Sequence, residues 1–257
     1  MVESYIDLGR FYDHKALKEK RTEIAAATKG YKSHYGRAYR CFTAAAQLME
    51  DNRALVLTPA LEEKMAKRAK GIMSREIKKT DRKPGQMKQR FLGAVSCQGI
   101  SCRFETANAL CGKVYELCDT YGVGAGMLTS LAAGAMGAGY DVIVCPCPLF
   151  PDRAEHLIIP ALGLAFVTST PSLPYEGRPY RRVRLDAMID ADLMREYKAR
   201  LKFSRKVISS LLSEGTEALA QAKAEHDVLE KLYNPHVDFD GVYQQAQAVA
   251  GELLEML

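Results

Sequence analysis

The chain has 257 residues, of which 47% are hydrophobic and 26% are charged, and its formal net charge is +5. This length is enough to bury the core of one large domain or two small ones, and the composition is that of an ordinary folded protein. The mild positive charge permits contact with nucleic acid or other anions but does not demand it.

The sequence also bears on the compartment in which the protein works. It contains no run of about 18 apolar residues, the length that a membrane-spanning helix needs. Its first ten residues, MVESYIDLGR, lack the charged-then-apolar layout of a signal peptide. The seven cysteines, an odd number, favour reduced thiols over a disulfide framework. We therefore expect a cytoplasmic protein that does not associate with membranes.

Two helices are predicted in the first third of the chain. Residues 13–51 carry apolar side chains at steps that sum to whole helical turns, which predicts one long helix. A second helix follows Pro59. We expect residues 1–80 to form a helical hairpin, and residues 81–90, polar and interrupted by Pro84 and Gly85, to form a linker.

The pattern changes to short β-rich runs in residues 91–188. The stretch RFLGAVSCQGISCRFE predicts two strands that turn near Gln98 and Gly99. The runs KVYELC, YDVIVC and LGLAFVT are continuously apolar, as in parallel strands that are covered on both faces. The helix between the first two is rich in small residues that permit close packing. We therefore predict an α/β domain with a mostly parallel sheet.

A second helical hairpin is predicted in residues 189–257. A long helix runs to about Tyr233, the stretch NPHVDFDG interrupts it, and a shorter helix closes the chain. This hairpin repeats the first at an offset of 177 residues: the offset pairs Asp13 with Asp190 and Glu19 with Glu196. The ordered set of elements is a stronger sign of a repeat than these identities. We therefore expect that the chain begins inside a duplicated protein whose first α/β unit is absent.

The glycine-rich segment after KVYELC has the position of a nucleotide-binding loop. A working phosphate-binding loop has the form G-x-x-x-x-G-K-[ST], in which lysine reaches the outer phosphates and the hydroxyl holds Mg²⁺. The best alignment, YGVGAGML, keeps the second glycine but places Met127 and Leu128 at the lysine and hydroxyl positions. Backbone N–H groups and the helix N-terminus could still hold an anion. The candidate nucleotide-binding or anion-binding residues are Gly122, Val123, Gly124, Ala125, Gly126, Met127, Leu128 and Thr129. The other reading is a relic loop that only joins strand to helix.

The segments RFLGAVSCQGISCRFET, VYELCDTYGVGAGMLTSL and PYRRVRLDAMID resemble an uncharacterised group of bacterial P-loop ATPase-like proteins. The resemblance covers nearly the whole chain. It implies an NTP-binding ancestry, two tandem P-loop units that are each followed by a helical hairpin, and a P-loop NTPase-like sheet with flanking helices. Members of the group carry GKS or GKT in at least one unit, and Met127 and Leu128 depart from that signature.

Other residues near this loop have alternative readings. Arg153 and His156, which follow the YDVIVC strand, are candidate anion contacts, or they belong to a solvated loop with a helix-capping Asp. Cys145 and Cys147 could form a composite zinc cluster with other cysteines, although buried apolar thiols are the commoner case. After the third core strand, Thr168, Ser169 and Thr170 stand where an active P-loop enzyme has a carboxylate, and hydroxyls cannot act as a base at neutral pH. The basic residues Arg178, Arg181, Arg182 and Arg184 could form a face for nucleic acid.

The sequence thus predicts a P-loop NTPase-like protein with a degenerate nucleotide site, non-hydrolysing and structural or regulatory, with weak binding of ATP or another NTP as its remaining activity. We assign no catalytic residue and no metal ligand, and we do not expect Mg²⁺ to be held. The expected partner is the missing P-loop unit or a second copy of the chain. One alternative is an active ATPase or small-molecule kinase with an atypical loop. Another is a nucleic-acid-associated module that uses the basic loops.

Overall fold

The computed structural model describes residues 5–255, and the contacts within it divide the chain into two compact units. The first unit comprises residues 1–37 and 218–257, and the second comprises residues 38–217. The predicted hairpins of residues 1–80 and 189–257 include residues 1–4 and 256–257, which lie outside the described residues. The predicted boundaries near residues 80 and 189 do not coincide with this division. The end of the first long helix, at Val56, and the helix after it belong to the core of the sheet.

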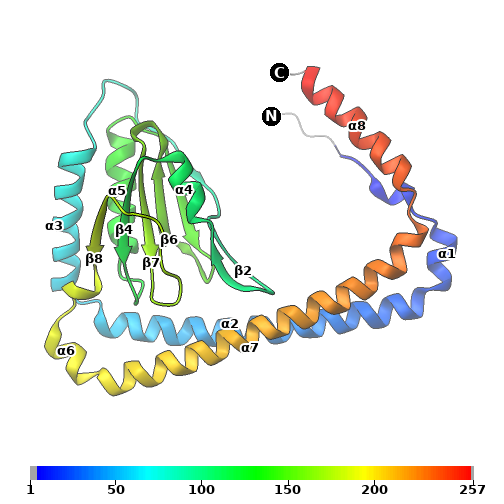
Figure 1. The fold of residues 1–257 in the computed structure, drawn as a ribbon, viewed down its shortest axis with the longest axis horizontal. Coiled ribbons are helices and arrows are strands. Elements are labelled where there is room, and N and C mark those ends of the chain that lie inside the picture. The colour runs from blue at the N-terminus through cyan, green and yellow to red at the C-terminus, as the bar shows by residue number, and fades with distance from the viewer. Residues whose placement is uncertain (1–4, 256–257) are drawn as a thin grey trace. The chain divides into compact units, whose positions relative to one another are not determined.

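The second unit contains a six-stranded sheet in the order β1-β5-β6-β7-β4-β8 (Figure 1). The strands are β1 (Met87–Gln89), β4 (Lys113–Cys118), β5 (Val142–Cys147), β6 (Phe150–Ile159), β7 (Leu164–Ser169) and β8 (Arg181–Arg184). The pairs β1–β5, β4–β7 and β4–β8 are parallel, whereas β6 is antiparallel to both of its neighbours. The predicted α/β class and mostly parallel sheet are confirmed.

Two differences from the predicted sheet have physical reasons. Strand β1 falls inside the predicted linker, because an exposed edge strand needs backbone pairing on one side and shows no apolar alternation. Strand β6 lies where one of the two sequence interpretations placed a solvated loop, since the stretch Phe150–Glu155 contains three charged residues. Its second half, from His156 to Ile159, is fully buried and pairs with β7. That burial stabilises the strand regardless of its charged first half.

Helices cover both faces of the sheet, as Figure 1 shows with α4 (Phe104–Leu110) and α5 (Ala125–Gly137) on opposite sides. Alternate residues of each strand point to opposite faces. On β7, Leu164 and Phe166 join the core formed with α5 and with α3 (Pro59–Glu76), whereas Ala165 and Val167 join the core beneath α4. The predicted strand pair is confirmed as a separate antiparallel hairpin of β2 (Gly93–Ser96) and β3 (Gly99–Cys102).

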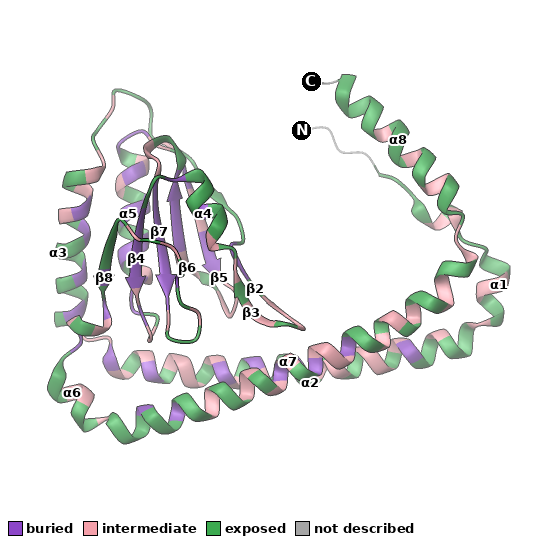
Figure 2. Cartoon of the chain, viewed as in Figure 1, coloured by how far each residue is buried: buried purple, intermediate pink, exposed green. Residues whose placement is uncertain are grey.

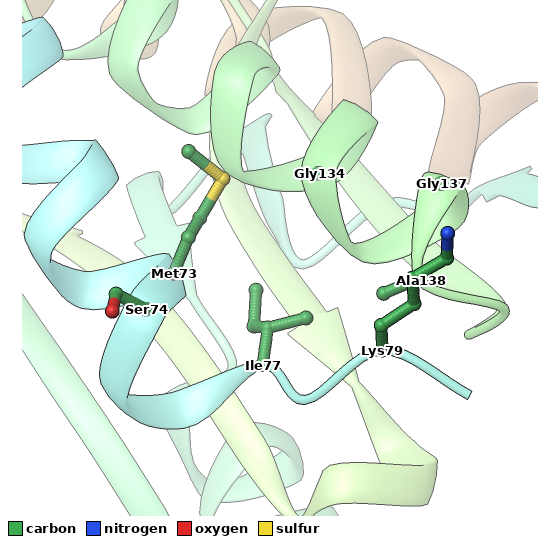
Figure 3. Close-up of a pocket in the computed structure, with 7 residues that line it drawn as sticks. All are labelled: Met73, Ser74, Ile77, Lys79, Gly134, Gly137 and Ala138. Carbon is green, nitrogen blue, oxygen red and sulfur yellow. The ribbon is translucent and has the colours of Figure 1, made fainter.

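The small residues of α5 allow α3 to approach it closely. A Cβ atom on Gly134 would lie 2.2 Å from Sδ of Met73, so a side chain at this position would displace the methionine. Figure 3 shows Met73 lying beside α5 at this contact, where a shallow hollow of about 400 Å³ opens between Met73, Ile77 and Ala138. The sequence predicted close packing of this helix on the sheet, and at Gly134 the close neighbour is instead α3.

The two predicted helical segments repeat with the same element bounds. Helices α1 (His14–Glu19) and α2 (Arg21–Val56) recur, each bound shifted by 177 residues, as α6 (Ala191–Glu196) and α7 (Lys198–Tyr233). The side chains of Asp13 and Asp190 cap the first helix of each copy by accepting two backbone N–H groups. The third helix of the second copy, α8 (Phe239–Glu255), is shifted by 180 residues at its start relative to α3. The ordered elements of the predicted repeat are therefore present.

The first unit contains helices and no strand of a sheet among its described residues. It comprises η1 (Leu8–Phe11), α1, the start of α2, the end of α7, η4 (Asn234–His236) and α8. An isolated bridge pairs Tyr12 with Val237, and Tyr12 also packs edge-on against Tyr233. Helix α8 buries no residue, in contrast to the strands of the sheet (Figure 2).

Candidate functional site

The glycine loop has the placement that the sequence predicted for it. It follows β4, which lies between the parallel neighbours β7 and β8, and it leads into α5 at Gly124. Gly122 has a φ of 68°, in the left-handed region that favours glycine. In open α/β sheets, ligands gather at the carboxyl ends of the strands, and this loop lies at the carboxyl end of β4.

The interior of the loop is occupied by the carboxylate of Asp119. Its two oxygens accept hydrogen bonds from the backbone N–H groups of Val123 at 3.0 Å and Gly124 at 2.7 Å. Asp119 is 3% exposed. Burial raises the pKa of this carboxyl group, and the N–H groups of Gly124 and Val123 oppose the rise. Two of the backbone donors that a phosphate would need are therefore bound to an acid of the chain itself.

The glycine at position 124 allows this close approach. A Cβ atom there would lie 2.7 Å from Cδ1 of Leu185 and 3.0 Å from Oδ2 of Asp119. Gly126, the glycine that aligns with the phosphate-binding motif, has no atom within 4 Å of its added Cβ. The tight packing in this loop is therefore around Asp119 and Leu185.

The two positions that hold lysine and a hydroxyl residue in an active phosphate-binding loop are buried in the core of this chain. Met127 and Leu128 are 2% and 1% exposed and belong to the core between α5, α3 and the sheet. Burying each of these side chains stabilises the fold by about 1.5–3 kcal/mol. The Thr129 hydroxyl donates to the carbonyl oxygen of Ala125 within the helix. No lysine or arginine occurs between Val114 and Asp152, so the loop carries no cationic side chain of its own.

Contacts from other elements fix the loop in place. Nε of Arg53, on α2, donates to the carbonyl oxygen of Gly122 at 3.1 Å. The carboxylate of Asp186, just after β8, accepts from both the backbone N–H and the hydroxyl of Thr120. The loop is thus bound to three parts of the second unit, namely α2, the segment after β8 and its own flanking strand and helix.

A cavity of about 710 Å³ opens beside the loop within the second unit. Apolar side chains from α2, the β5–β6 turn and α7 form much of its wall, among them Met49, Leu149, Phe150, Ile208 and Leu212. Its polar lining residues include Asn52, Asp119, Tyr121, Arg153, Glu155 and Arg205. The loop residues Gly122 and Ala125 also line it, so the candidate loop and the cavity are adjacent.

Arg153 lines this cavity, but its charge is compensated. Its guanidinium forms an ion pair with Glu50 of α2, and the same group lies over the ring of Phe150, 4.3 Å from the ring centroid. The sequence offered Arg153 as an anion contact, and the structure brings it to the cavity already paired with a carboxylate.

The next acid on β6, Glu155, also lines the cavity. Burial raises the pKa of Glu155 to about 7; the Cys147 thiol opposes the rise through a hydrogen bond, and the charge of Asp119 adds to it. At neutral pH this side chain exchanges between a carboxylate and a carboxylic acid. Sequence reasoning missed Glu155, because it read this segment as a solvated loop.

His156 does not supply the anion contact that the sequence offered as one alternative. It is 1% exposed and lies beneath α4, where its ring packs edge-on against Phe104. Nδ1 accepts the backbone N–H of Thr168 at 3.1 Å, which leaves the ring proton on Nε2, 3.5 Å from Sγ of Cys102. Burial lowers the pKa of His156 to about 3, so the ring is neutral. A neutral, enclosed imidazole does not attract an anion.

The geometry around the cysteines argues against the zinc alternative. Burial raises the pKa of Cys102 and Cys147 to about 12 and that of Cys145 to about 11, so these thiols are neutral in the metal-free chain. The ring proton on Nε2 of His156 points toward Cys102 and blocks ligation from that nitrogen. Within residues 5–255, the side chains close enough to share a metal ion are His226, Asp227 and Glu230, in the first unit.

A buried carboxylate lies near the end of the third core strand, although β4 and not β7 supplies it. Glu116 is 5% exposed; it accepts from the Ser169 hydroxyl at 2.7 Å and from Nε of Arg182 at 2.6 Å. Arg182, one of the candidate nucleic-acid contacts, is therefore paired with an acid. Both oxygens of Glu116 therefore have a partner.

No family model, no curated protein and no solved structure matches this chain. Among the described residues, no helix combines the length and the apolar character needed to cross a membrane.

Proposed function

We propose that this chain is a P-loop NTPase-like protein whose glycine loop does not hydrolyse nucleotide and serves a structural or regulatory role. The observation that carries the proposal is the carboxylate of Asp119, which accepts the N–H groups of Val123 and Gly124. A triphosphate entering the loop would have to displace this acid and would meet its negative charge. ATP binding would therefore be weak, and Leu128 offers no hydroxyl group as a ligand for Mg²⁺.

The contacts of the loop support a structural or regulatory role. Arg53 and Asp186 both form hydrogen bonds with it, so a shift of the loop would also displace α2 and the segment that leads into α6. Hydrolysis needs groups that act on the outer phosphates, and the positions that would supply them, Met127 and Leu128, lie in the core. The loop is thus suited to joining elements of the second unit.

The test is the release of phosphate from ATP by the full chain, with and without Mg²⁺. The proposal predicts turnover at background level that does not respond to the metal. Gly126→Val and Gly137→Val form a matched pair, because both positions lie on α5 and have open space around an added Cβ. Mg²⁺-dependent turnover that Gly126→Val abolishes and Gly137→Val preserves would overturn the proposal and favour an atypical ATPase.

A further inference from the structure

One residue in the wall of the cavity beside the glycine loop has a buried polar atom that the fold leaves without a partner. Among residues 5–255, Oδ1 of Asn52 is the buried side-chain atom without a hydrogen-bond partner. Asn52 is 6% exposed, lies on α2 and lines the cavity. A buried polar atom without a partner costs about 1–3 kcal/mol, so its presence in the wall of a cavity points to a partner supplied from outside the chain.

The remaining lining indicates which ligand chemistry fits. Most of the wall is apolar, from residues such as Phe150, Ile208 and Leu212. The acids Asp119 and Glu155 line the same space. Of the two arginines in the lining, Arg153 is paired with Glu50, and Arg205 donates to the hydroxyl of Tyr121. A negatively charged ligand would lose its hydration there and would meet these acids. The volume of about 710 Å³ is in the range of small-molecule sites.

We propose that this cavity binds a neutral, mostly apolar small molecule that carries an N–H group, which donates to Oδ1 of Asn52. The apolar body of the ligand packs between α2, the β5–β6 turn and α7, and the carboxyl group of Glu155 is a second acceptor in the same wall. This inference does not rest on the proposed function, because it concerns the cavity and not the phosphate-binding capacity of the loop.

The probe for this site is N-phenyl-1-naphthylamine, a neutral aromatic amine with one N–H group whose fluorescence rises in apolar surroundings. Two related compounds test the contributions of its neutral charge and of its N–H group. 8-Anilino-1-naphthalenesulfonate adds a negative charge to the same skeleton, and 1-phenoxynaphthalene replaces the N–H by oxygen. We expect the amine to bind the full chain saturably, and the sulfonate to bind at least about tenfold more weakly because its charge must be desolvated near two acids.

Ser209→Trp and Ser210→Trp test the location of the bound amine. Both serines are exposed neighbours on α7, but Ser209 lines the cavity and Ser210 does not. The first substitution places an indole in the cavity mouth and should weaken binding of the amine by at least about tenfold, whereas the second should leave it within about twofold. Equal binding by the two variants would place the probe elsewhere and overturn the proposal.

Asn52→Leu tests the hydrogen bond. Losing one neutral hydrogen bond should weaken binding of the amine by about fivefold relative to the wild type. The dissociation constant of 1-phenoxynaphthalene, measured by its displacement of the amine, should be the same for the variant and the wild type. A proportional loss for both compounds, or no loss for either, would overturn the assignment of Asn52. MgATP added to the wild-type chain separates the two proposals. Micromolar binding of ATP, or its turnover, contradicts the proposed function of the loop, whereas the amine data alone decide the cavity.

Discussion

The strongest energetic prediction concerns Asp119, whose carboxylate fills the glycine loop. Asp119→Ala leaves the N–H groups of Val123 and Gly124 buried without an acceptor. Each unsatisfied donor costs about 1–3 kcal/mol, so the second unit should lose about 2–5 kcal/mol of unfolding free energy after partial relaxation. Relief of the burial cost of the carboxylate, which raises its pKa, works in the opposite direction and favours the lower half of that range.

The assay is urea denaturation followed by circular dichroism, with Asp186→Ala as the matched control. Asp186 also accepts two hydrogen bonds, from the N–H and the hydroxyl of Thr120, but it is only partly buried. Water can replace its carboxylate, so the control should lose less than half as much stability as Asp119→Ala. The reasoning is refuted if Asp119→Ala costs less than about 0.5 kcal/mol, or no more than the control.

Three further outcomes can be measured on the same material. Gly124→Ala should lower the free energy of unfolding by about 1–3 kcal/mol, because its Cβ would meet Leu185. Gly126→Ala should be neutral or slightly stabilising, because an added Cβ there has open space. Equal effects of the two substitutions would show that the loop is not packed around Asp119. Glu155 binds a proton more tightly in the folded chain than in the unfolded one, so the free energy of unfolding should fall by about 2–3 kcal/mol as pH rises from 4.5 to about 7. In denaturation curves measured across this pH range, Glu155→Gln should remove most of that fall. Asn52→Leu should raise the melting temperature of the ligand-free chain, since it removes an unsatisfied oxygen; a lower melting temperature would mean that the amide has a structural role.

Much of the fold could be predicted from patterns along the chain. The periodicity of residues 13–51 identified the long helix, although the structure interrupts it at Lys20 and extends it to Val56. The runs KVYELC, YDVIVC and LGLAFVT became β4, β5 and β7 because each is apolar on both faces. The repeat at an offset of 177 recurs in the helix bounds. Each of these features depends on residues that are close together in the sequence, so it could be predicted from the sequence alone.

The strand β6 and the interior of the site were not predictable in this way. The first half of β6 contains Asp152, Arg153 and Glu155 and is partly exposed at a cavity, whereas its second half, His156–Ile159, is buried in the interior of the sheet. Asn52 and Glu155 come from distant parts of the chain, and tertiary packing brings them to one cavity. One local signal was available: Asp119 follows a buried strand directly and precedes a glycine loop, where an acid can accept the N–H groups of the turn.

The central claim, that the loop N–H groups serve Asp119 and not a phosphate, is tested most directly by the amide resonances of Val123 and Gly124 during titration with MgATP. The account predicts that these two resonances do not shift up to about 1 mM nucleotide. It also predicts that both shift when acid protonates the carboxyl group of Asp119. Saturable shifts of both amides at micromolar MgATP would contradict the account, because they would place phosphate oxygens where the carboxylate now lies.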